Sequence, residues 1–436
     1  MPSRDTSLLD AALDPMPGPA LCIGLSGGLD SATLLHVLAQ RCRRDARALR
    51  AVHVHHGLSA HADAWVAACE AMCASLEVPL VVRRVHVDAR EGQGIEAAAR
   101  DARRAAFADV LEPGEVLVLA HHRDDQAETV LLRALRGSGP DGLGAMQAWR
   151  PFARGHLWRP WLDRPRALIE AHARGHGLRW IEDDSNASDR FDRNYLRHHV
   201  MPLLHARWPH ASDALATSAA HCRDATRLLD HDDALALAAV RVRDTHALSI
   251  MALGELPSER RARVLRAWIA SLGLPPLPRT GVQRIEVDLL NARADASASF
   301  AWHGAIIQAW RDLLHARRLR EPLASTWHAT WTGDGVYALP DGGTLALDGI
   351  AQFDPPVVLR ARSGGERITL PGRTHSHSLK HVLQEWGIAP WTRAHLPLIL
   401  TSDGDLLAAG DLIYSASFTG WLGDRGARLI WTQPHD

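Results

Sequence analysis

Short apolar runs alternate with stretches of helical spacing through the first half of the chain. Four runs have the length and composition of buried strands, at 20–25, 49–54, 80–87 and 116–120. Apolar residues three or four positions apart follow each run and predict helices, over 32–38, 62–76, 95–110 and 124–136. Strands and helices in this order form a parallel sheet with right-handed crossovers and helices on both faces. The pattern therefore predicts an α/β domain, which we bound at 1–210.

The second half of the chain changes pattern twice. Helical spacing continues over 164–176 and 191–204, and then from His210 to about Arg320 in a region rich in Ala, Leu and Arg. Beyond Glu321, short β-prone runs alternate with Gly-Asp and Asp-Gly turns, and Asp354-Pro355-Pro356 has the composition of a linker. We therefore predict a helical domain over 211–325 and a small α+β domain over 355–436.

A glycine-rich hexapeptide stands between the first predicted strand and the first predicted helix. Its residues are Ser26, Gly27, Gly28, Leu29, Asp30 and Ser31. Two glycines let the backbone approach a ligand closely, and free N–H groups at a helix start favour an anion. A bare phosphate would repel Asp30, so its expected partner is a Mg²⁺ carried by that phosphate. The alternative is an ordinary strand–helix turn with Ser and Asp as caps.

Composition excludes several classes of protein. The 436 residues include 49 basic and 50 acidic ones, so a net charge of −1 leaves no chain-wide basic surface for nucleic acid. The only lysine is Lys380, and the glycine loop lacks the Gly-Lys-Ser/Thr of a Walker A site. Five cysteines without a Cys-x-x-Cys pair argue against zinc ribbons and iron–sulfur clusters. No apolar run approaches the roughly 20 residues of a membrane span and no secretory signal is recognisable, so we expect a cytoplasmic protein without a membrane partner.

One segment is nevertheless locally basic. Between 360 and 393, six basic residues stand against Glu366 and Glu385, which leaves a charge of +4 with His neutral. Trp386 and Trp391 lie among them, and basic residues with interleaved aromatics suit phosphate contact and base stacking. The alternative is a solvated face over two core tryptophans.

The hexapeptide resembles the pyrophosphate-binding loop of the N-type ATP pyrophosphatases, the PP-loop superfamily. These enzymes cleave ATP between the α- and β-phosphates and transfer AMP to an acceptor oxygen. The other motifs, in order, resemble one member family, the tRNA(Ile)-lysidine synthetases. The resemblance rests on 51–58, Glu96–Arg100, His121–Thr129, Arg136–Gly139, Glu182–Asn186, Arg193–Arg197, Pro371–Arg373, Ser378–Lys380 and Pro390–Trp391. One departure is Arg103-Arg104, where the family often has Arg-Tyr.

The resemblance implies a Rossmann-like domain of the adenine nucleotide alpha hydrolase type, ATP and Mg²⁺ as cofactors, and lysidine formation as the reaction. Its substrates would be the isoleucine tRNA with a CAU anticodon and free L-lysine, and a homodimer is possible. The implied catalytic residues are Asp30, Asp125, Glu128, Arg193 and Arg197. Nucleotide contacts would come from the hexapeptide with His53, Arg100, His121 and Asp124. Contacts to tRNA would come from Arg367, Arg373, Lys380 and Trp391.

Several of these residues also have ordinary structural readings. The acids of 124–128 could simply complement a helix dipole. Arg193 and Arg197 share a helix face and could pair with Glu182, Asp183 or Asp184, clamp a phosphate, or do both. Two histidine groups have metal-like spacing, but a chain with 26 His produces such groups by chance. They are His53, His55, His56, His121 and His122, and His375, His377 and His381.

Two other functions remain open on sequence alone. One is a non-catalytic tRNA-binding or nucleotide-sensing protein on an enzyme scaffold, which the intact hexapeptide and acidic motif disfavour. The other is a PP-loop enzyme with a different acceptor, either another tRNA or a small molecule in an amide-forming reaction. Turnover without RNA would indicate a small-molecule acceptor, and that function leaves the basic segment 360–393 unexplained.

Overall fold

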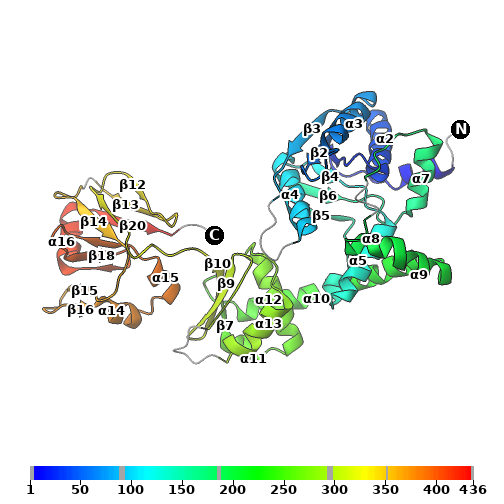
Figure 1. Ribbon diagram of the computed structural model, residues 1–436. Helices are drawn as coiled ribbons and strands as arrows, with labels where there is room; N and C mark the ends of the chain where they lie inside the picture. The colour runs from blue at the N-terminus through cyan, green and yellow to red at the C-terminus, as the bar shows by residue number, and fades with distance from the viewer. Residues whose placement is uncertain (1–3, 88–93, 184–187, 292–297, 350–351, 434–436) are drawn as a thin grey trace. The chain divides into compact units, whose positions relative to one another are not determined.

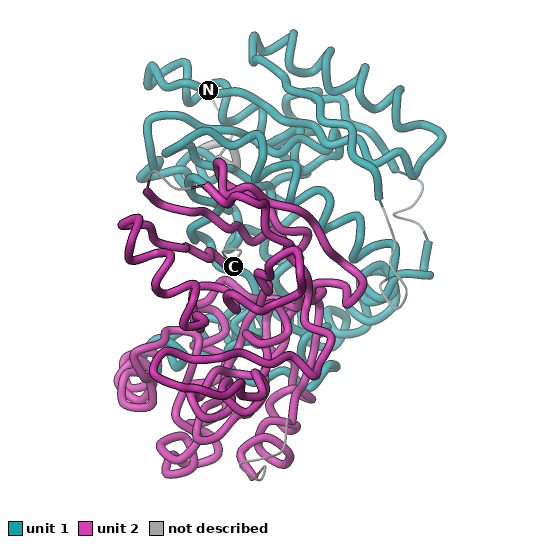
Figure 2. The backbone as a smooth tube through the Cα atoms, turned by 90° about the vertical axis from the view of Figure 1, so that its left-hand side faces the viewer, with its two compact units in different colours: residues 1–229 teal, residues 230–436 magenta. Residues whose placement is uncertain are grey.

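The computed structural model describes residues 4–87, 94–183, 188–291, 298–349 and 352–433. The chain divides into two compact units, residues 1–229 and 230–436 (Figure 2). Of the predicted acidic motif, Asp184, Ser185 and Asn186 lie outside the described residues.

The first unit is built on a six-stranded sheet, which confirms the predicted α/β architecture (Figure 1). In sheet order the strands are β3 (Leu80–Arg84), β2 (Ala48–His55), β1 (Ala20–Gly24), β4 (Val116–Val118), β6 (Gly155–Trp158) and β5 (Trp149–Phe152). The first five are parallel, and β5 pairs antiparallel with β6 as a hairpin. The chain leaves β1 toward β2 on one side and later returns to β4 on the other, so β1 and β4 flank the point where the strand order reverses. Ligands of open α/β sheets bind at such a point, beyond the carboxyl ends of the strands.

Helices cover both faces of this sheet. The main ones are α2 (Leu29–Arg44), α3 (Ala62–Ser75), α4 (Ile95–Val110), α5 (Arg123–Leu135) and α7 (Arg166–Gly175). One buried core gathers apolar side chains of α2, α3 and α7, together with α1 (Arg4–Ala11), against β1 and β4. A second core packs Phe107 and Val110 of α4 against Cys22, Val52 and Leu117. The central strands β1 and β4 are therefore buried on both faces, which explains why they are apolar almost throughout.

The segment after the sheet contains a π-helical turn that periodicity did not predict. The helix predicted over 191–204 is confirmed as continuous helix, made of α8 (Asp192–Tyr195), the π-helical turn (Leu196–Val200) and α9 (Met201–Arg207). Pro202 has no N–H and so cannot donate a hydrogen bond to the carbonyl four residues earlier. The N–H of Met201, the residue before it, donates to the carbonyl of Leu196, five residues earlier, as in a π-helix. Arg197 lies in this π turn. Beyond α9 the long helix α10 (Ala211–Val240) begins.

The second unit starts with helices but is not helical as far as Arg320. After α11 (Ile250–Glu255), α12 (Ser258–Ser271), α13 (Arg279–Arg284) and a π turn (Ile285–Leu289), the chain forms an antiparallel sheet. Its order is β7 (Ala247–Ser249), β10 (Leu313–Arg318), β9 (Ala305–Trp310) and β8 (Ser299–Trp302). The helical prediction is wrong over 299–318 because burial there alternates with period two, as Leu314 and Ala316 show. Gly304, at φ +78°, sits in the tight turn between β8 and β9.

The C-terminal part of the second unit has the predicted α+β composition. A five-stranded antiparallel sheet has the order β11 (His328–Trp331), β14 (Val357–Arg360), β17 (Leu398–Leu400), β18 (Leu406–Ala409) and β19 (Ile413–Tyr414). A second sheet contains β12 (Val336–Ala338), β13 (Thr344–Asp348) and β20 (Arg428–Thr432), and a third β15 (Arg367–Ile368) and β16 (His377–Ser378). The helices are α14 (Leu379–Glu385), α15 (Pro390–Ala394) and α16 (Ala416–Arg425). Since β11 pairs with β14, the linker predicted at 354–356 lies between two strands of one sheet.

Candidate active site

The glycine loop joins β1 to α2 and leaves the start of that helix without a side-chain cap. The hydroxyl oxygens of Ser26 and Ser31 are 2.9 Å apart, and Ser31 Oγ donates to the Gly28 carbonyl at 3.1 Å. Gly28 is the N-cap residue of α2 and has no side chain to accept from the first turn. The uncapped N–H groups and the helix dipole together favour an anion at this end. The ordinary reading, in which Ser or Asp caps the helix, is therefore wrong here.

Gly27 is a position that only glycine fills without strain. Its φ is +86°, and a Cβ there would lie 2.3 Å from Cδ1 of Ile181 and 3.1 Å from Sγ of Cys69. The Ile181 N–H also donates to the Gly27 carbonyl at 2.9 Å, which holds the segment after β6 and α7 against the loop. The loop is thus shaped by its own backbone conformation and by a distant segment.

We expect Gly27→Ala to lower the free energy of unfolding by about 2 kcal/mol, because it adds a left-handed backbone penalty and a steric clash. ATP affinity should fall with it, since the loop has to shift. Gly114→Ala is the matched control, because Gly114 has φ +78° but a Cβ there would meet no atom of the described residues within 4 Å. Urea unfolding and ATP titration measure both. Equal destabilisation by the two substitutions would contradict the close approach to Ile181.

The end of β4 leads into α5 through a reciprocal cap. His122 Nδ1 accepts from the backbone N–H of Asp125 at 3.4 Å, and Asp125 Oδ2 accepts from the backbone N–H of His122 at 3.1 Å. Burial lowers the pKa of the His122 imidazole, but the surrounding carboxylates, Asp30 first among them, outweigh burial and raise this pKa overall. His122 thus fixes the start of α5 and faces the phosphate loop.

Asp125, Glu128, Arg193 and Arg197 form one ion-pair cluster between α5 and the 192–200 segment. Arg193 Nε donates to Glu128 Oε2 at 2.7 Å, and Arg197 Nε donates to Glu128 Oε1 at 2.7 Å. The second guanidinium nitrogens reach Asp125 Oδ1, at 2.9 Å from Arg193 and 3.1 Å from Arg197. Glu128 is 2% exposed, so its charge is held almost entirely by the two arginines. Burial raises the pKa of Asp125, but the positive charges around it outweigh burial and lower that pKa to about 2.

The partners of the two arginines lie 65 to 72 residues before them in the chain. The sequence suggested Glu182, Asp183 or Asp184 instead, which are neighbours in sequence, and Asp184 lies outside the described residues. The carboxylates of α5 therefore do more than complement its dipole, because they anchor a pair of guanidiniums at the site.

Asp30 lies in the first turn of α2 and faces this cluster. Its Oδ1 atom is buried and has no hydrogen-bond partner among the described residues. Two basic side chains stand just beyond hydrogen-bond distance, Arg166 Nε at 3.6 Å and His122 Nε2 at 3.7 Å. Burial lowers the pKa of Arg197, but its ion pair with Glu128 and the charges of Asp125 and Asp30 outweigh burial and raise it. Asp30 thus presents an oxygen that no protein group satisfies among those the structure describes, beside a helix end that favours phosphate.

Two strand-end histidines near the loop are neutral. His53 Nδ1 lies 2.9 Å from the Leu25 carbonyl, so the ring donates to the backbone just before the loop, and burial lowers its pKa. His121 Nδ1 accepts from Arg159 Nε at 3.3 Å, and burial lowers the pKa of His121 to about 3. Both rings contact protein groups here, and their predicted contacts with nucleotide stay predictions.

Asp124 and Arg100 occupy different surroundings. Asp124 Oδ2 accepts from the backbone N–H of Arg166 at 2.8 Å and its Oδ1 from Ser212 Oγ at 3.0 Å, so this carboxylate joins α5 to the starts of α7 and α10. Arg100 is exposed on α4. Desolvation and the charges of Arg100 and Arg193 lower the pKa of Arg103, so these three guanidiniums lie close enough to repel one another. Contacts of Asp124 and Arg100 with nucleotide stay predictions.

Three residues at the site were not selected from the sequence. His122 was missed because His is not a usual capping residue, and Arg166 because a single Arg after Pro165 carries no motif. Arg103 was noted only as a departure from the family pattern, although it supplies charge beside Arg193. The sequence signal for His122 was its place inside the His121–Thr129 motif, where it was considered only as part of a metal-like histidine group.

The predicted tRNA-binding residues all belong to the second unit. Arg367 donates to the hydroxyl and carbonyl oxygens of Ser376, at 2.9 and 2.6 Å, across the β15–β16 hairpin. Arg373 and Lys380 are exposed, in the turn before β16 and on α14. Trp391 is half-buried and stacks on His315, with ring centroids 4.6 Å apart. Trp386 is 53% exposed, so the reading of two core tryptophans fails for it.

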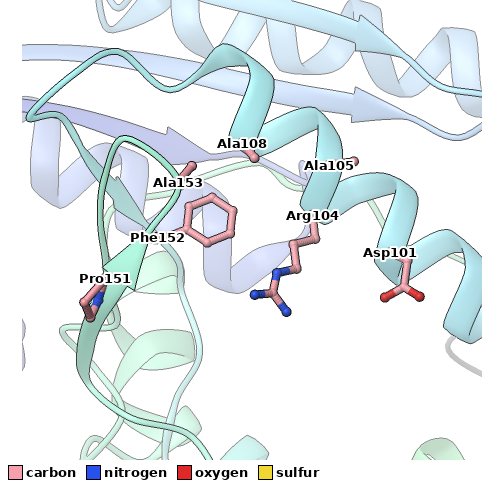
Figure 3. A pocket seen from close by; sticks show the side chains of 7 residues that line it. All are labelled: Asp101, Arg104, Ala105, Ala108, Pro151, Phe152 and Ala153. Atoms are coloured by element: carbon pink, nitrogen blue, oxygen red, sulfur yellow. The ribbon is translucent and has the colours of Figure 1, made fainter. Parts of the chain in front are cut away.

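A surface hollow of the first unit lies against α4 and the β5–β6 hairpin (Figure 3). Its lining residues are Asp101, Arg104, Ala105, Ala108, Pro151, Phe152 and Ala153. The Arg104 guanidinium lies 5.9 Å from the centre of the Phe152 ring, a cation–π contact. None of the predicted site residues lines this hollow, and we assign it no role.

The two histidine groups that have metal-like spacing in the sequence do not come together as sets of possible ligands among the described residues. Within the described ranges, the group of three or more possible ligands that comes together is His36, His172 and His176, which belongs to neither predicted group. Also within those ranges, no helix has the length and apolarity needed to cross a bilayer.

Comparison with known proteins agrees with this geometry. Residues 2–204 match the PP-loop domain, so the fold and the loop define a PP-loop nucleotide-binding protein. Residues 248–323 match the TilS substrate binding domain and 357–431 the TilS substrate C-terminal domain. The chain is 51% identical to tRNA(Ile)-lysidine synthase of Xanthomonas axonopodis pv. citri, over 96% of this chain and 95% of the relative. It is 50% identical to that of Xylella fastidiosa over 97% of each chain, and 42% identical to that of Pseudomonas fluorescens over 95% and 93%. The chain belongs to the tRNA(Ile)-lysidine synthase family.

Proposed function

We propose that this protein ligates lysine to carbon 2 of the wobble cytidine in the CAU anticodon of the isoleucine tRNA, with ATP cleaved to AMP and pyrophosphate. The observation that carries the proposal is full-length membership of the family at 51% identity. An uncapped α2 start beside an unsatisfied Asp30 oxygen supports nucleotide chemistry at the predicted loop. A protein that binds only tRNA would have no need of that arrangement.

The reaction has two steps. The oxygen on carbon 2 of the cytidine attacks the α-phosphorus of ATP, and pyrophosphate leaves. The ε-amine of lysine then attacks carbon 2, AMP leaves, and the nitrogen releases a proton. Both steps depend on positioning and on charge stabilisation, which the site supplies as backbone N–H groups and guanidiniums.

The site residues fit a Mg²⁺–phosphate group. Asp30 Oδ1 is buried without a hydrogen-bond partner among the described residues, and a carboxylate oxygen is the type of ligand that Mg²⁺ prefers. Bound Mg²⁺ would neutralise phosphate charge and stabilise the departing pyrophosphate. Asp30 would hold this ion through its free oxygen, while the N–H groups of α2 hold phosphate oxygens.

The ion-pair cluster has a positioning role in this proposal. Glu128 accepts from Arg193 and Arg197 at 2.7 Å each, and Asp125 accepts from both, so the carboxylates fix two guanidiniums beside Asp30. Fixed guanidiniums match phosphate oxygens well. Because both Glu128 oxygens are engaged by arginines, we favour Glu128 as the residue that positions the arginines. A proton acceptor for the amine would first have to release them.

The second unit is proposed to bind tRNA. Arg373 and Lys380 are exposed within the basic segment, and Trp391 lines a hollow with Trp310 and His315. Arg317, Arg318 and Arg320 line the same hollow, so aromatic and basic groups share one surface there. This combination suits phosphate contact and base stacking.

We expect Arg373→Ala and Lys380→Ala each to weaken tRNA binding several-fold and to reduce the salt slope by about one, while ATP affinity stays unchanged. Lys380→Arg should retain binding because it keeps the charge. Arg43→Ala is a control, since Arg43 is exposed at the far end of α2 and pairs with Glu77. Filter binding at several salt concentrations measures the slope. Unchanged affinity and slope in both alanine variants would remove these residues from the tRNA surface.

The test of the function is direct. The full chain is incubated with the isoleucine tRNA, ATP, Mg²⁺ and radiolabelled lysine, and label is counted in the RNA. The expected result is lysine incorporation together with AMP and pyrophosphate release. ATP cleavage without RNA would support a small-molecule acceptor, and tRNA binding without any ATP cleavage would support a non-catalytic protein. Either outcome would overturn the proposal.

The setting of the reaction follows from its substrates. We propose that the protein works in the cytoplasm, where tRNA, ATP and free lysine are present. Its five cysteines are free thiols, as expected in a reducing compartment. A homodimer stays a prediction.

A further inference from the structure

Three histidines converge between α2 and α7, on the first unit but outside the phosphate loop. His36 comes from α2, while His172 and His176 lie one turn apart at the end of α7. One ring nitrogen from each residue lies within 4.8 Å of the corresponding nitrogens of the other two. Their ring centroids are 4.1 Å apart between His172 and His176, 5.5 Å between His36 and His172, and 5.2 Å between His36 and His176.

The His172 ring is buried although it is polar, and no hydrogen bond of the described residues compensates for its burial. It is 1% exposed, and neither of its ring nitrogens has a hydrogen-bond partner among the described residues. Buried polar groups in folded proteins are nearly always paired, because an unpaired one loses its hydration without compensation. A ligand between the three rings would satisfy it.

Hydrogen bonds to the rings of His176 and His36 leave one nitrogen of each ring available for a ligand. His176 Nδ1 lies 3.0 Å from the His172 backbone carbonyl, so Nδ1–H donates there and the lone pair is left on Nε2. His176 is exposed, which gives an ion a path from solvent. The Gln40 side-chain amide lies 2.9 Å from His36 Nε2, where a turn of the amide would let its oxygen accept from that ring.

Burial disfavours the charged form of two of the three rings. Burial lowers the pKa of His172 to about 4, helped by the neighbouring rings, and burial lowers the pKa of His36 as well. Neutral imidazoles are the form that binds divalent transition metals, without competition from protons near pH 7.

We propose that His36, His172 and His176 form a binding site for a divalent transition metal ion of the zinc type, with water completing its coordination. Imidazole nitrogens suit Zn²⁺, Co²⁺, Ni²⁺ and Cu²⁺ and do not suit Mg²⁺. In a tetrahedral site with bonds of about 2.0–2.1 Å the nitrogens are roughly 3.3 Å apart and the ion lies in the plane of each ring, so metal binding requires the stacked rings of His172 and His176 to turn as well as to draw together.

The site would link two elements that build the nucleotide site. The first turn of α2 carries Asp30, and the first turn of α7 carries Arg166, whose N–H donates to Asp124. A bound ion would clamp the middle of α2 to the C-terminal end of α7. Metal binding is therefore expected to raise the thermal stability of the protein, because the ion binds only the folded arrangement.

Cobalt is the probe that tests the site. The full chain is freed of metal with a chelator and titrated with Co²⁺ in excess Mg²⁺, which occupies oxygen sites. The expected result is one equivalent of Co²⁺ with the intense visible absorption of a nitrogen-ligated ion of low coordination number, displaced by Zn²⁺. His176→Ala should weaken this binding by about tenfold or more and abolish the metal-dependent rise in melting temperature.

His176→Ala carries the test because His176 is exposed and its loss should not unfold the protein, whereas His172→Asn could. His210→Ala is the matched control, since the His210 side chain is 91% exposed and lies outside the cluster. Equal Co²⁺ affinity in His176→Ala and the unaltered chain would overturn the proposal, and so would binding only to scattered surface histidines, seen as weak binding of many equivalents. The result does not depend on lysidine formation.

Discussion

Asp30→Ala is expected to slow tRNA-dependent pyrophosphate release by about 10³-fold while leaving the protein folded. Asp30 Oδ1 has no hydrogen-bond partner among the described residues, so removing the carboxylate breaks no hydrogen bond through that atom and only a long ion pair with Arg166. Its nearest cations, Arg166 and His122, stand 3.6 and 3.7 Å away. The variant would lose charge stabilisation of the departing pyrophosphate. One well-placed group of this kind typically contributes a factor of about 10²–10³ to the rate.

The measurement is pyrophosphate release at saturating tRNA, with thermal unfolding followed in parallel. Asp63→Ala is the matched control, because Asp63 is also an acid in the first turn of a helix but its side chain is 79% exposed beside Arg84. Its rate should stay within about twofold of the unaltered chain, since exposed positions away from a site change little. A rate retained in Asp30→Ala would remove the proposed metal role, and unfolding of the variant would show that Asp30 is structural.

The sheet and the loop could be predicted because their signals are local. The four predicted strands of the first unit are short apolar runs, and the hexapeptide follows the first of them directly, so chain order alone places Asp30 at the carboxyl end of β1. The β5–β6 hairpin, with the short sequences WRPF and GHLW, has no such run and was not predicted. The same reasoning places Asp125 and Glu128 after β4, beside the same reversal of strand order. Local order thus brings the two motifs together at one edge of the sheet.

What could not be predicted depends on contacts between distant segments. The pairing of Arg197 with Glu128 spans 69 residues, and nothing in the local sequence of either residue selects the other. Residues 299–318 lie within a longer region that is rich in Ala, Leu and Arg, which favours helix, yet burial on one face of a sheet overrides that preference. The π turn at Leu196–Val200 has the apolar spacing of an ordinary helix, and only the hydrogen bond from Met201 to Leu196 reveals it.

Charge distribution connects these observations with the single lysine. A net charge of −1 is compatible with an RNA substrate because positive and negative residues are distributed unevenly over the chain. At the active site, carboxylates pair with arginines, whereas other basic residues are available to contact RNA elsewhere. Arginine suits both tasks, since its planar guanidinium can bridge two carboxylates or grip a phosphate. An arginine-rich chain therefore needs few lysines for tRNA chemistry.

Glu128→Gln is expected to slow both steps of the reaction. It should also lower the free energy of unfolding by about 2 kcal/mol. The substitution keeps the shape of the side chain but removes the negative charge that pairs with Arg193 and Arg197. Among the described residues, Asp125 is then the one carboxylate left to pair with these two partly buried guanidiniums. Glu77→Gln is the control, because the Glu77 side chain is 82% exposed and its pair with Arg43 should contribute almost nothing.

The two roles open to Glu128 give different kinetic results. If Glu128 positions the arginines, pyrophosphate release and lysine transfer both slow and the pH dependence of each step keeps its shape. If Glu128 accepts the proton of the amine, lysine transfer alone slows, and it recovers at higher pH, where more of the amine is already neutral. Rapid-quench measurement of the adenylated tRNA and of lysidine across pH separates the steps. We expect the first pattern, because each carboxylate oxygen of Glu128 already accepts a hydrogen bond at 2.7 Å from an arginine, and a guanidinium stays protonated, so neither oxygen is free to take the proton of the amine.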